Sequence, residues 1–142
     1  MRLLVILLLL SFKSFAFDPS CEDYYPMATN GKDGEEIRMI IPGSKIVKAK
    51  SWEPELGEPP LSSVESYNIV KQWSVSNLVN FDGIEIEEVS LKKYGCSPHR
   101  SKKPYWYYQI EYSALIDGNI LWGSANWLVV LMSGEVIAPV KD

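Results

Sequence analysis

The segment 105–116 restricts the fold most strongly, because it has the clearest alternation in the chain. Its even positions, from Trp106 to Ile116, are all apolar or aromatic, whereas positions 109, 111 and 113 are polar. A period of two residues is typical of a strand with one buried face. Asp117-Gly118-Asn119 then provides a tight hairpin turn, and residues 120–132 alternate again. The sequence therefore predicts an antiparallel sheet in this half of the chain.

One amphipathic helix is predicted before these strands. Ser62-Ser63-Val64-Glu65 has the spacing of a capping box, in which the serine and the glutamate bond to each other's backbone. Apolar residues follow at intervals of three, which predicts a helix over residues 63–76 with one buried face. These residues are Val64, Tyr67, Val70 and Trp73. The preceding segment 53–60 contains three prolines and is predicted to be a connector, because proline lacks a backbone donor.

The N-terminal half has weaker patterns. Residues 17–34 are polar and rich in turn pairs, so we expect an irregular arm. Residues 37–41 alternate, Pro42-Gly43 fits a type II turn, and residues 45–52 are predicted to return as a second strand of an N-terminal hairpin. Further on, the apolar parity changes between Ile86 and Val89, which predicts a β-bulge near Glu87-Glu88. A short last strand is expected over residues 135–140.

The order of these elements predicts an α+β fold. A hairpin, a helix and a meander of three or four strands suggest one helix packed on an antiparallel sheet, which buries the apolar face of each. Residues 17–142 are expected to form this single domain, since that length suits one hydrophobic core.

The first 16 residues have the layout of a secretory signal peptide. Arg2 precedes the unbroken apolar run Leu3–Leu10, and small residues stand at Ser14 and Ala16, so cleavage is expected after Ala16. The run is shorter than the roughly 20 residues that span a bilayer, so we expect no stable membrane anchor after cleavage. The protein is predicted to be exported to the periplasm or the extracellular space.

Charge and cysteine content are consistent with export. Loss of the leader removes two cationic residues and makes the formal charge more negative than the −4 of the whole sequence, which argues against nucleic acid as a partner. Cys21 and Cys96 are the only cysteines. In an oxidising compartment they are expected to form a disulfide, which would stabilise the fold by about 4 kcal/mol on the chain-entropy account. The alternative is a pair of free thiols.

Part of the chain resembles a known kind of domain. The capped helix from Ser62, the aromatic strand 105–112 and the closing segment 129–137 are similar to the helix-on-sheet arrangement of cystatin-like domains, and more narrowly to small exported PepSY-like domains. The resemblance implies inhibition or chaperoning of envelope hydrolases. The chain departs from it in two ways. The cystatin Gln-x-Val-x-Gly loop is missing, and Leu131-Met132 stand where an acidic residue often precedes the closing turn.

The sequence contains no recognisable catalytic or metal-binding set. His99 is the only histidine, and no Gly-x-Ser-x-Gly elbow is present, so we predict no serine triad. One histidine and two paired cysteines do not make a zinc site. Two glutamate groups, at 53, 55 and 58 and at 85, 87 and 88, lack the spacing of a calcium loop. We expect no metal and no cofactor, while a hydrolase built on paired carboxylates stays open.

Two features suggest contact with a partner. Tyr105 and Tyr107 lie on the polar side of their strand, and Trp122 lies opposite the apolar side of its own. Exposed aromatic residues on a sheet are good contact anchors, although packing beneath the N-terminal hairpin is an alternative. The loop that contains His99, Arg100, Lys102 and Lys103 is basic in an acidic protein and suits an acidic partner or an anionic lipid, or is an ordinary solvated loop.

From these features we expect a non-enzymatic binding or inhibitory module of the cell envelope. Its partner would be a protein, such as an envelope hydrolase or a toxin. The alternatives are a structural or accessory envelope protein and a small carboxylate-based hydrolase.

Overall fold

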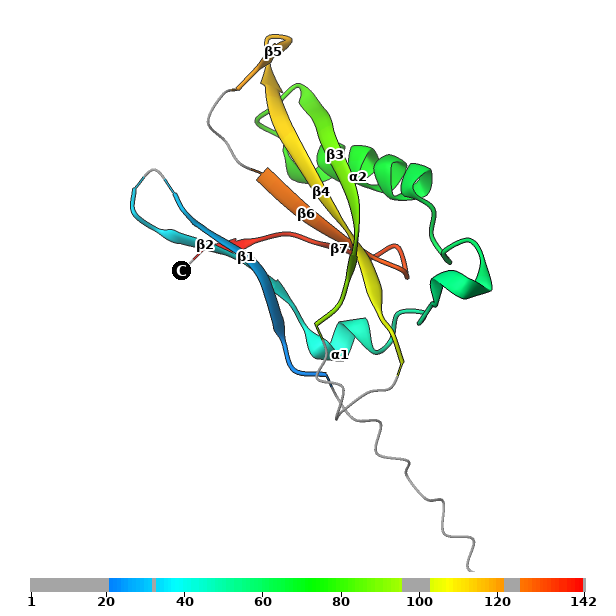
Figure 1. Cartoon of the computed structure of the whole chain (residues 1–142). Coiled ribbons are helices and arrows are strands. Elements are labelled where there is room, and N and C mark those ends of the chain that lie inside the picture. Colours follow the sequence, from blue (N-terminus) through cyan, green and yellow to red (C-terminus); the bar gives the residue numbers. More distant parts are fainter. Residues whose placement is uncertain (1–20, 32, 96–102, 122–125, 142) are drawn as a thin grey trace, which may run out of the picture.

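The computed structural model describes residues 21–31, 33–95, 103–121 and 126–141. One long helix and two antiparallel sheets form this part of the chain (Figure 1), so the α+β class is confirmed. The larger sheet has the order β3 (Gly83–Lys93), β4 (Trp106–Ile116), β6 (Asn126–Leu131) and β7 (Val136–Ile137), and β5 (Asn119–Ile120) also pairs with β4. The smaller sheet has the order β1 (Tyr24–Asn30), β2 (Glu36–Ile41) and β8 (Val140–Lys141).

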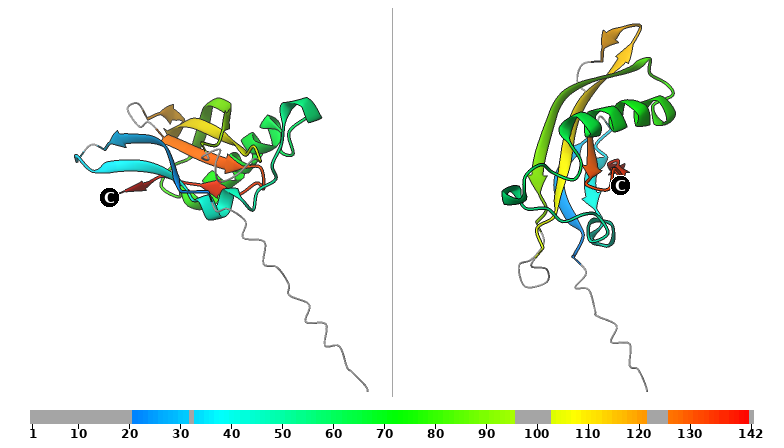
Figure 2. Two further views of the ribbon diagram at one scale, coloured as in Figure 1. Left: turned by 60° about the horizontal axis from the view of Figure 1, so that its bottom comes forward. Right: turned by 90° about the vertical axis from the view of Figure 1, so that its right-hand side faces the viewer.

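Helix α2 (Ser63–Asn77) forms where the sequence predicts it. The capping box is present: the Glu65 backbone N–H donates to Ser62 Oγ at 3.2 Å, and the Ser62 backbone N–H donates to Glu65 Oε2 at 2.8 Å. The Ser62 backbone N–H and the Ser62 hydroxyl both donate to the Glu65 carboxylate, and they hold the pKa of that carboxyl below its ordinary value. The helix packs against the concave face of the larger sheet (Figure 2). None of the helices that the structure describes is long and apolar enough to cross a bilayer.

The buried side of α2 agrees only in part with the predicted one, since Val70 is buried and Trp73 packs against the core but Val64 and Tyr67 do not follow. Ser66, Val70 and Ser74 are buried, whereas the Val64 side chain is 67% exposed and Tyr67 is 40% exposed. Serine is small, so this side of the helix approaches the sheet closely. The two hydroxyls donate to helix carbonyls, of Ser63 and Lys71, each at 2.8 Å, which offsets the cost of burying them. A prediction from the spacing of apolar residues misses a buried helix face that contains serine.

The predicted irregularities of the larger sheet are confirmed. Ile86 pairs with Tyr112 and Glu88 pairs with Glu111, so Glu87 is the extra residue of a β-bulge. At the hairpin, Ile116 pairs with Asn119, and the two turn residues Asp117 and Gly118 have φ of 52° and 72°. Two positive φ angles define a type I′ turn, whose twist matches that of the strands.

The predictions for the N-terminal half are wrong in two places. Residues 24–30 are not an irregular arm but form β1, which pairs with β2. The chain after β2 does not return as a strand over residues 45–52 but forms one helical turn, α1 (Gly43–Ile46). The physical reason is that β2 already has β1 on one side and β8 on the other, which leaves no free edge for another strand.

The end of the chain divides between the sheets. The predicted strand over residues 135–140 is two short strands, of which β7 pairs with β6 and β8 pairs with β2. Consequently the C-terminal end lies beside the N-terminal strands (Figure 1). Every residue of β6 from Trp127 to Leu131 is buried, because α2 and β2 both contact this strand. Both faces of the larger sheet are therefore covered along β6.

Candidate functional site: a hollow around Trp106

One end of β4 extends beyond the helix that covers the sheet. Eleven residues of strand span about 36 Å, whereas the fifteen residues of α2 span about 22 Å. Trp106 is the first residue of β4 and pairs with Lys93, the last residue of β3. The Tyr108 hydroxyl, two positions along, donates to the Leu61 carbonyl at 2.9 Å just before α2. Trp106 therefore lies on the helix side of the sheet but beyond the start of the helix.

The proline-rich connector borders this uncovered end. Its one turn of 3₁₀ helix, η1 (Pro54–Leu56), follows Trp52, whose backbone N–H donates to the Pro104 carbonyl at 3.2 Å. The Trp52 indole N–H donates to the Gly57 carbonyl at 3.0 Å, so Trp52, ahead of η1, is bonded to the residue that follows it. The Trp52 and Trp106 rings meet edge to face, with centroids 5.5 Å apart.

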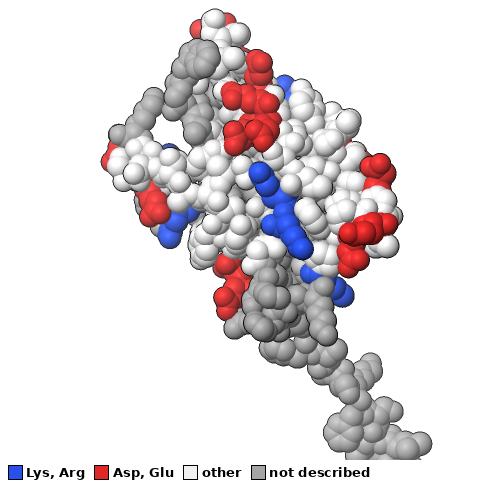
Figure 3. All heavy atoms as spheres, viewed as in Figure 1, with Lys and Arg blue, Asp and Glu red and all other residues white. Residues whose placement is uncertain are grey.

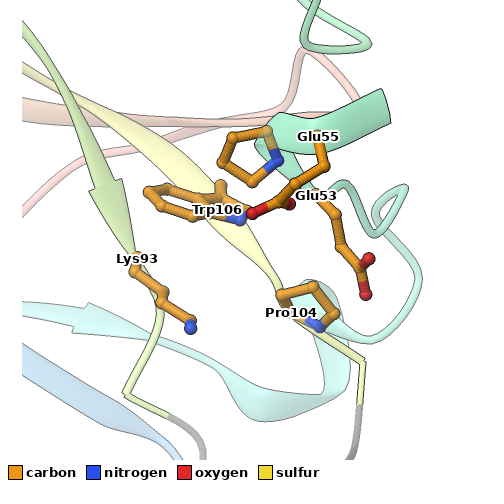
Figure 4. Close-up of a pocket in the computed structure, with 6 residues that line it drawn as sticks. Glu53, Glu55, Lys93, Pro104 and Trp106 are labelled. Atoms are coloured by element: carbon orange, nitrogen blue, oxygen red, sulfur yellow. The ribbon is translucent and has the colours of Figure 1, made fainter. Parts of the chain in front are cut away.

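An open hollow with a volume of about 500 Å³ lies between the connector and the strand ends. Its lining consists of two carboxylates, one ammonium, two proline rings and one indole (Figure 4): Glu53, Glu55, Lys93, Pro54, Pro104 and Trp106. In the view of Figure 4, the Glu55 carboxylate lies next to the Trp106 indole and Lys93 approaches from the other side. Both glutamates and Lys93 are exposed, and Trp106 is half-buried.

The indole of Trp106 has two unusual features. Its N–H is buried and has no hydrogen-bond acceptor among the described residues, and a buried donor without a partner is costly. Its ring also accepts a cation, because Lys93 Nζ lies 5.9 Å from the ring centroid, within the range of cation–π attraction. The N–H is closed to solvent, so what the hollow offers is a ring face that is already suited to a positive charge.

The two carboxylates of the hollow do not form an acid–base pair of the usual kind. Such a pair needs environments that differ for its two members, whereas Glu53 and Glu55 are both exposed and flank one proline in a single turn. Among the described residues, no group of three or more His, Cys, Asp or Glu side chains is placed to hold a metal ion. The arrangement suits binding better than bond cleavage.

Two of the predicted contact residues have a different role. Tyr105 and Tyr107 are only 4% and 2% exposed, so neither is an outer-face anchor. The alternative of packing beneath the N-terminal strands holds for Tyr107, whose ring lies 6.5 Å from that of Tyr24 in β1. Burial, followed by the neighbouring Tyr24, raises the pKa of the Tyr107 phenol. The polar side of β4 is thus covered at this end by the smaller sheet.

Most of the other predicted contact residues lie outside the described part of the chain. Trp122, His99, Arg100 and Lys102 lie outside the described residues, while Lys103 is exposed at the start of the segment that leads to β4. Cys21 is buried, but Cys96 lies outside the described residues, as does the leader 1–16. The disulfide and the cleavage of the leader therefore stay predictions.

A second charged surface lies on the other side of the larger sheet. Acidic side chains gather over the upper part of β3 and β4, with basic side chains below them (Figure 3). Glu85, Glu87 and Glu88 are exposed there, and the Ser113 hydroxyl donates to the Glu87 carboxylate. This group is a solvated face of the bulged strand.

Comparison with known proteins gives no match: no family profile, no curated protein and no solved structure is similar to this chain. The resemblance to cystatin-like and PepSY-like domains stays a prediction.

Proposed function

We propose that the mature chain is an exported, non-enzymatic module that binds a protein partner through the Trp106 hollow. The observation that carries this proposal is the half-buried Trp106 ring at an open hollow bordered by Lys93 and Glu55. Half-buried tryptophan next to charged groups is the composition of a binding hot spot. A partner that packs on the exposed part of the indole ring would shield it from water.

Support also comes from the rigidity of the surrounding structure. Trp106 is the first residue of a central strand, and Trp52 fixes the connector through two hydrogen bonds, to Pro104 and to Gly57. A contact surface that is ordered before binding loses little entropy when the partner arrives. An envelope hydrolase is the kind of partner that the sequence resemblance implies, with inhibition as the corresponding role, and a toxin is the other candidate partner.

Capture from the cell envelope tests the proposal. The mature protein, residues 17–142, is immobilised and is expected to retain one partner specifically. Trp106→Phe is expected to lose this partner, because phenylalanine presents a smaller ring that attracts cations less strongly than an indole does. Val79→Ser is the matched control, since Val79 is 77% exposed and does not line the hollow. Equal capture by Trp106→Phe and wild type would place the contact elsewhere.

A further inference from the structure

The geometry points to a basic side chain, lysine or arginine, in a peptide segment of the partner as the group that the Trp106 hollow recognises. This inference rests on the proposed function and specifies the chemistry of the partner. It is carried by the Glu55 carboxylate beside the Trp106 ring and by Glu53, a second carboxylate of the same lining. An aromatic ring flanked by carboxylates attracts cations through both its quadrupole and the neighbouring charges.

Lys93 supports this choice of ligand. Its ammonium lies 5.9 Å from the Trp106 ring centroid, and it forms no salt bridge with any carboxylate of the described residues. The ring face of Trp106 therefore already holds a positive charge from within the chain. Lys93 is exposed and has a flexible stem, so it can leave the ring when a cation of the partner arrives.

The carboxylates favour a cation over an anion in the hollow. Glu53 and Glu55 likewise have no ion-pair partner among the described residues, and Glu58 is exposed on the same connector. An anionic side chain would gain one contact with Lys93 but would face at least two like charges. A basic side chain meets the opposite balance, with two attractive carboxylates and one repulsive ammonium.

Short capped peptides provide the test. Three probes, N-acetyl-Gly-X-Gly-amide with X as arginine, glutamine or glutamate, are titrated into the mature protein. Binding is followed by the NMR signal of the Trp106 indole N–H, assigned by its loss in Trp106→Phe. We expect the arginine probe to bind about 10-fold more tightly than the glutamine probe at low salt, which corresponds to about 1.4 kcal/mol. The glutamate probe is expected to bind most weakly, and salt should weaken the arginine probe.

Variants of exposed residues separate the contributions. The double variant Glu53→Gln with Glu55→Gln should reduce the affinity of the arginine probe about 10-fold, whereas Glu58→Gln, on the same connector but outside the lining, should change it little. Lys93→Gln should raise that affinity about threefold, because it frees the ring and removes a like charge. Its matched control is Lys92→Gln, next to it on β3 but outside the lining.

The outcomes distinguish this inference from the proposed function. Equal binding of the arginine and glutamine probes, or weaker binding after Lys93→Gln, would overturn the recognition of a basic side chain. If Trp106→Phe still abolishes capture of a protein from the envelope in that case, the proposed function stands. If the arginine probe binds as expected while capture is unaffected by Trp106→Phe, the hollow binds cations but is not the site of the captured partner.

Discussion

The two sheets differ in the sequence separation of the strands that pair within them. In the larger sheet, β4 connects to β5 through a two-residue turn, and β6 connects to β7 through the short turn at Gly134. The smaller sheet takes β8 from the opposite end of the chain, and Tyr94 closes its corner by donating to the Glu22 carbonyl at 2.6 Å. Local contacts form with little loss of loop entropy. We infer that the smaller sheet depends on the larger one being in place.

The largest expected effect falls on the corner of the smaller sheet, at Gly43. A Cβ on this residue would overlap the backbone carbonyl of Cys21, which cannot move easily because Asp23, two residues on, accepts from the Gly43 N–H at 3.0 Å. Gly43→Ala should therefore lower the free energy of unfolding by about 3 kcal/mol, the upper range for overpacking. Urea denaturation measures this change.

Gly83→Ala is the control for this substitution in the larger sheet. The nearest atom to a Cβ on Gly83 is Leu115 Cδ1 at 3.9 Å, an ordinary van der Waals contact. Equal destabilisation by Gly43→Ala and Gly83→Ala would contradict the expectation that a Cβ is tolerated at Gly83 in the larger sheet but not at the corner of the smaller sheet.

The next largest effect is expected for the Tyr94 hydroxyl. It donates to the carbonyls of Glu22 and Ile41, at 2.6 and 3.3 Å, and its ring meets that of Tyr24 with centroids 5.2 Å apart. Tyr94→Phe keeps the ring and removes the donor, which should cost about 1–2 kcal/mol. Hydrogen exchange should accelerate mainly in β1 and β2. A uniform acceleration that includes β3 and β4 would show that the two sheets unfold together, and Tyr25→Phe, at a side chain 56% exposed, is the control.

The same corner should weaken at alkaline pH. Burial, followed by the charge of Asp23 and by Tyr24, raises the pKa of Tyr94 from its ordinary value of 10.0 to about 12. The folded protein thus holds this proton more tightly than the unfolded chain does. Its contribution to stability is complete below pH 10 and is lost as the pH rises through about 12. Unfolding free energies between pH 8 and 12 should fall less steeply in Tyr94→Phe, and parallel curves would refute the role of Tyr94.

The difference between the sheets also explains which parts of the fold the sequence predicts. The capping box at Ser62, the bulge at Glu87 and the turn at Asp117-Gly118 are fixed by residues close in the chain, so local patterns reveal them. The segment before the strand at residues 24–30 is held by Tyr94, β2 has β8 at its other edge, and the helical turn after β2 lies against Cys21. No local pattern contains those contacts.

The candidate site was missed for a related reason. Alternation along β4 assigns Trp106 to the core, which is correct for Tyr108 and Ile110 beneath the helix. The helix is shorter than the strand, so the same face becomes a hollow at Trp106. The opposite face, predicted to be open at Tyr105 and Tyr107, is covered by a sheet of distant residues. The strand is longer in space than the helix that covers it, and this difference in length is the signal for an uncovered end.

The smallest expected effect is that of Val64→Ser in α2, the helix that packs on the larger sheet. Val70→Ser, at a buried position of the same helix, is the comparison for it. Val64 fits the apolar spacing that predicts the helix but is 67% exposed, whereas Val70 is fully buried against the strands. Val64→Ser should change the free energy of unfolding by no more than about 0.5 kcal/mol. Val70→Ser should cost about 3 kcal/mol, because it leaves a cavity and buries a hydroxyl. Thermal denaturation of both variants measures the ratio, and comparable losses would mean that the buried helix face runs through Val64 rather than through Ser66, Val70 and Ser74.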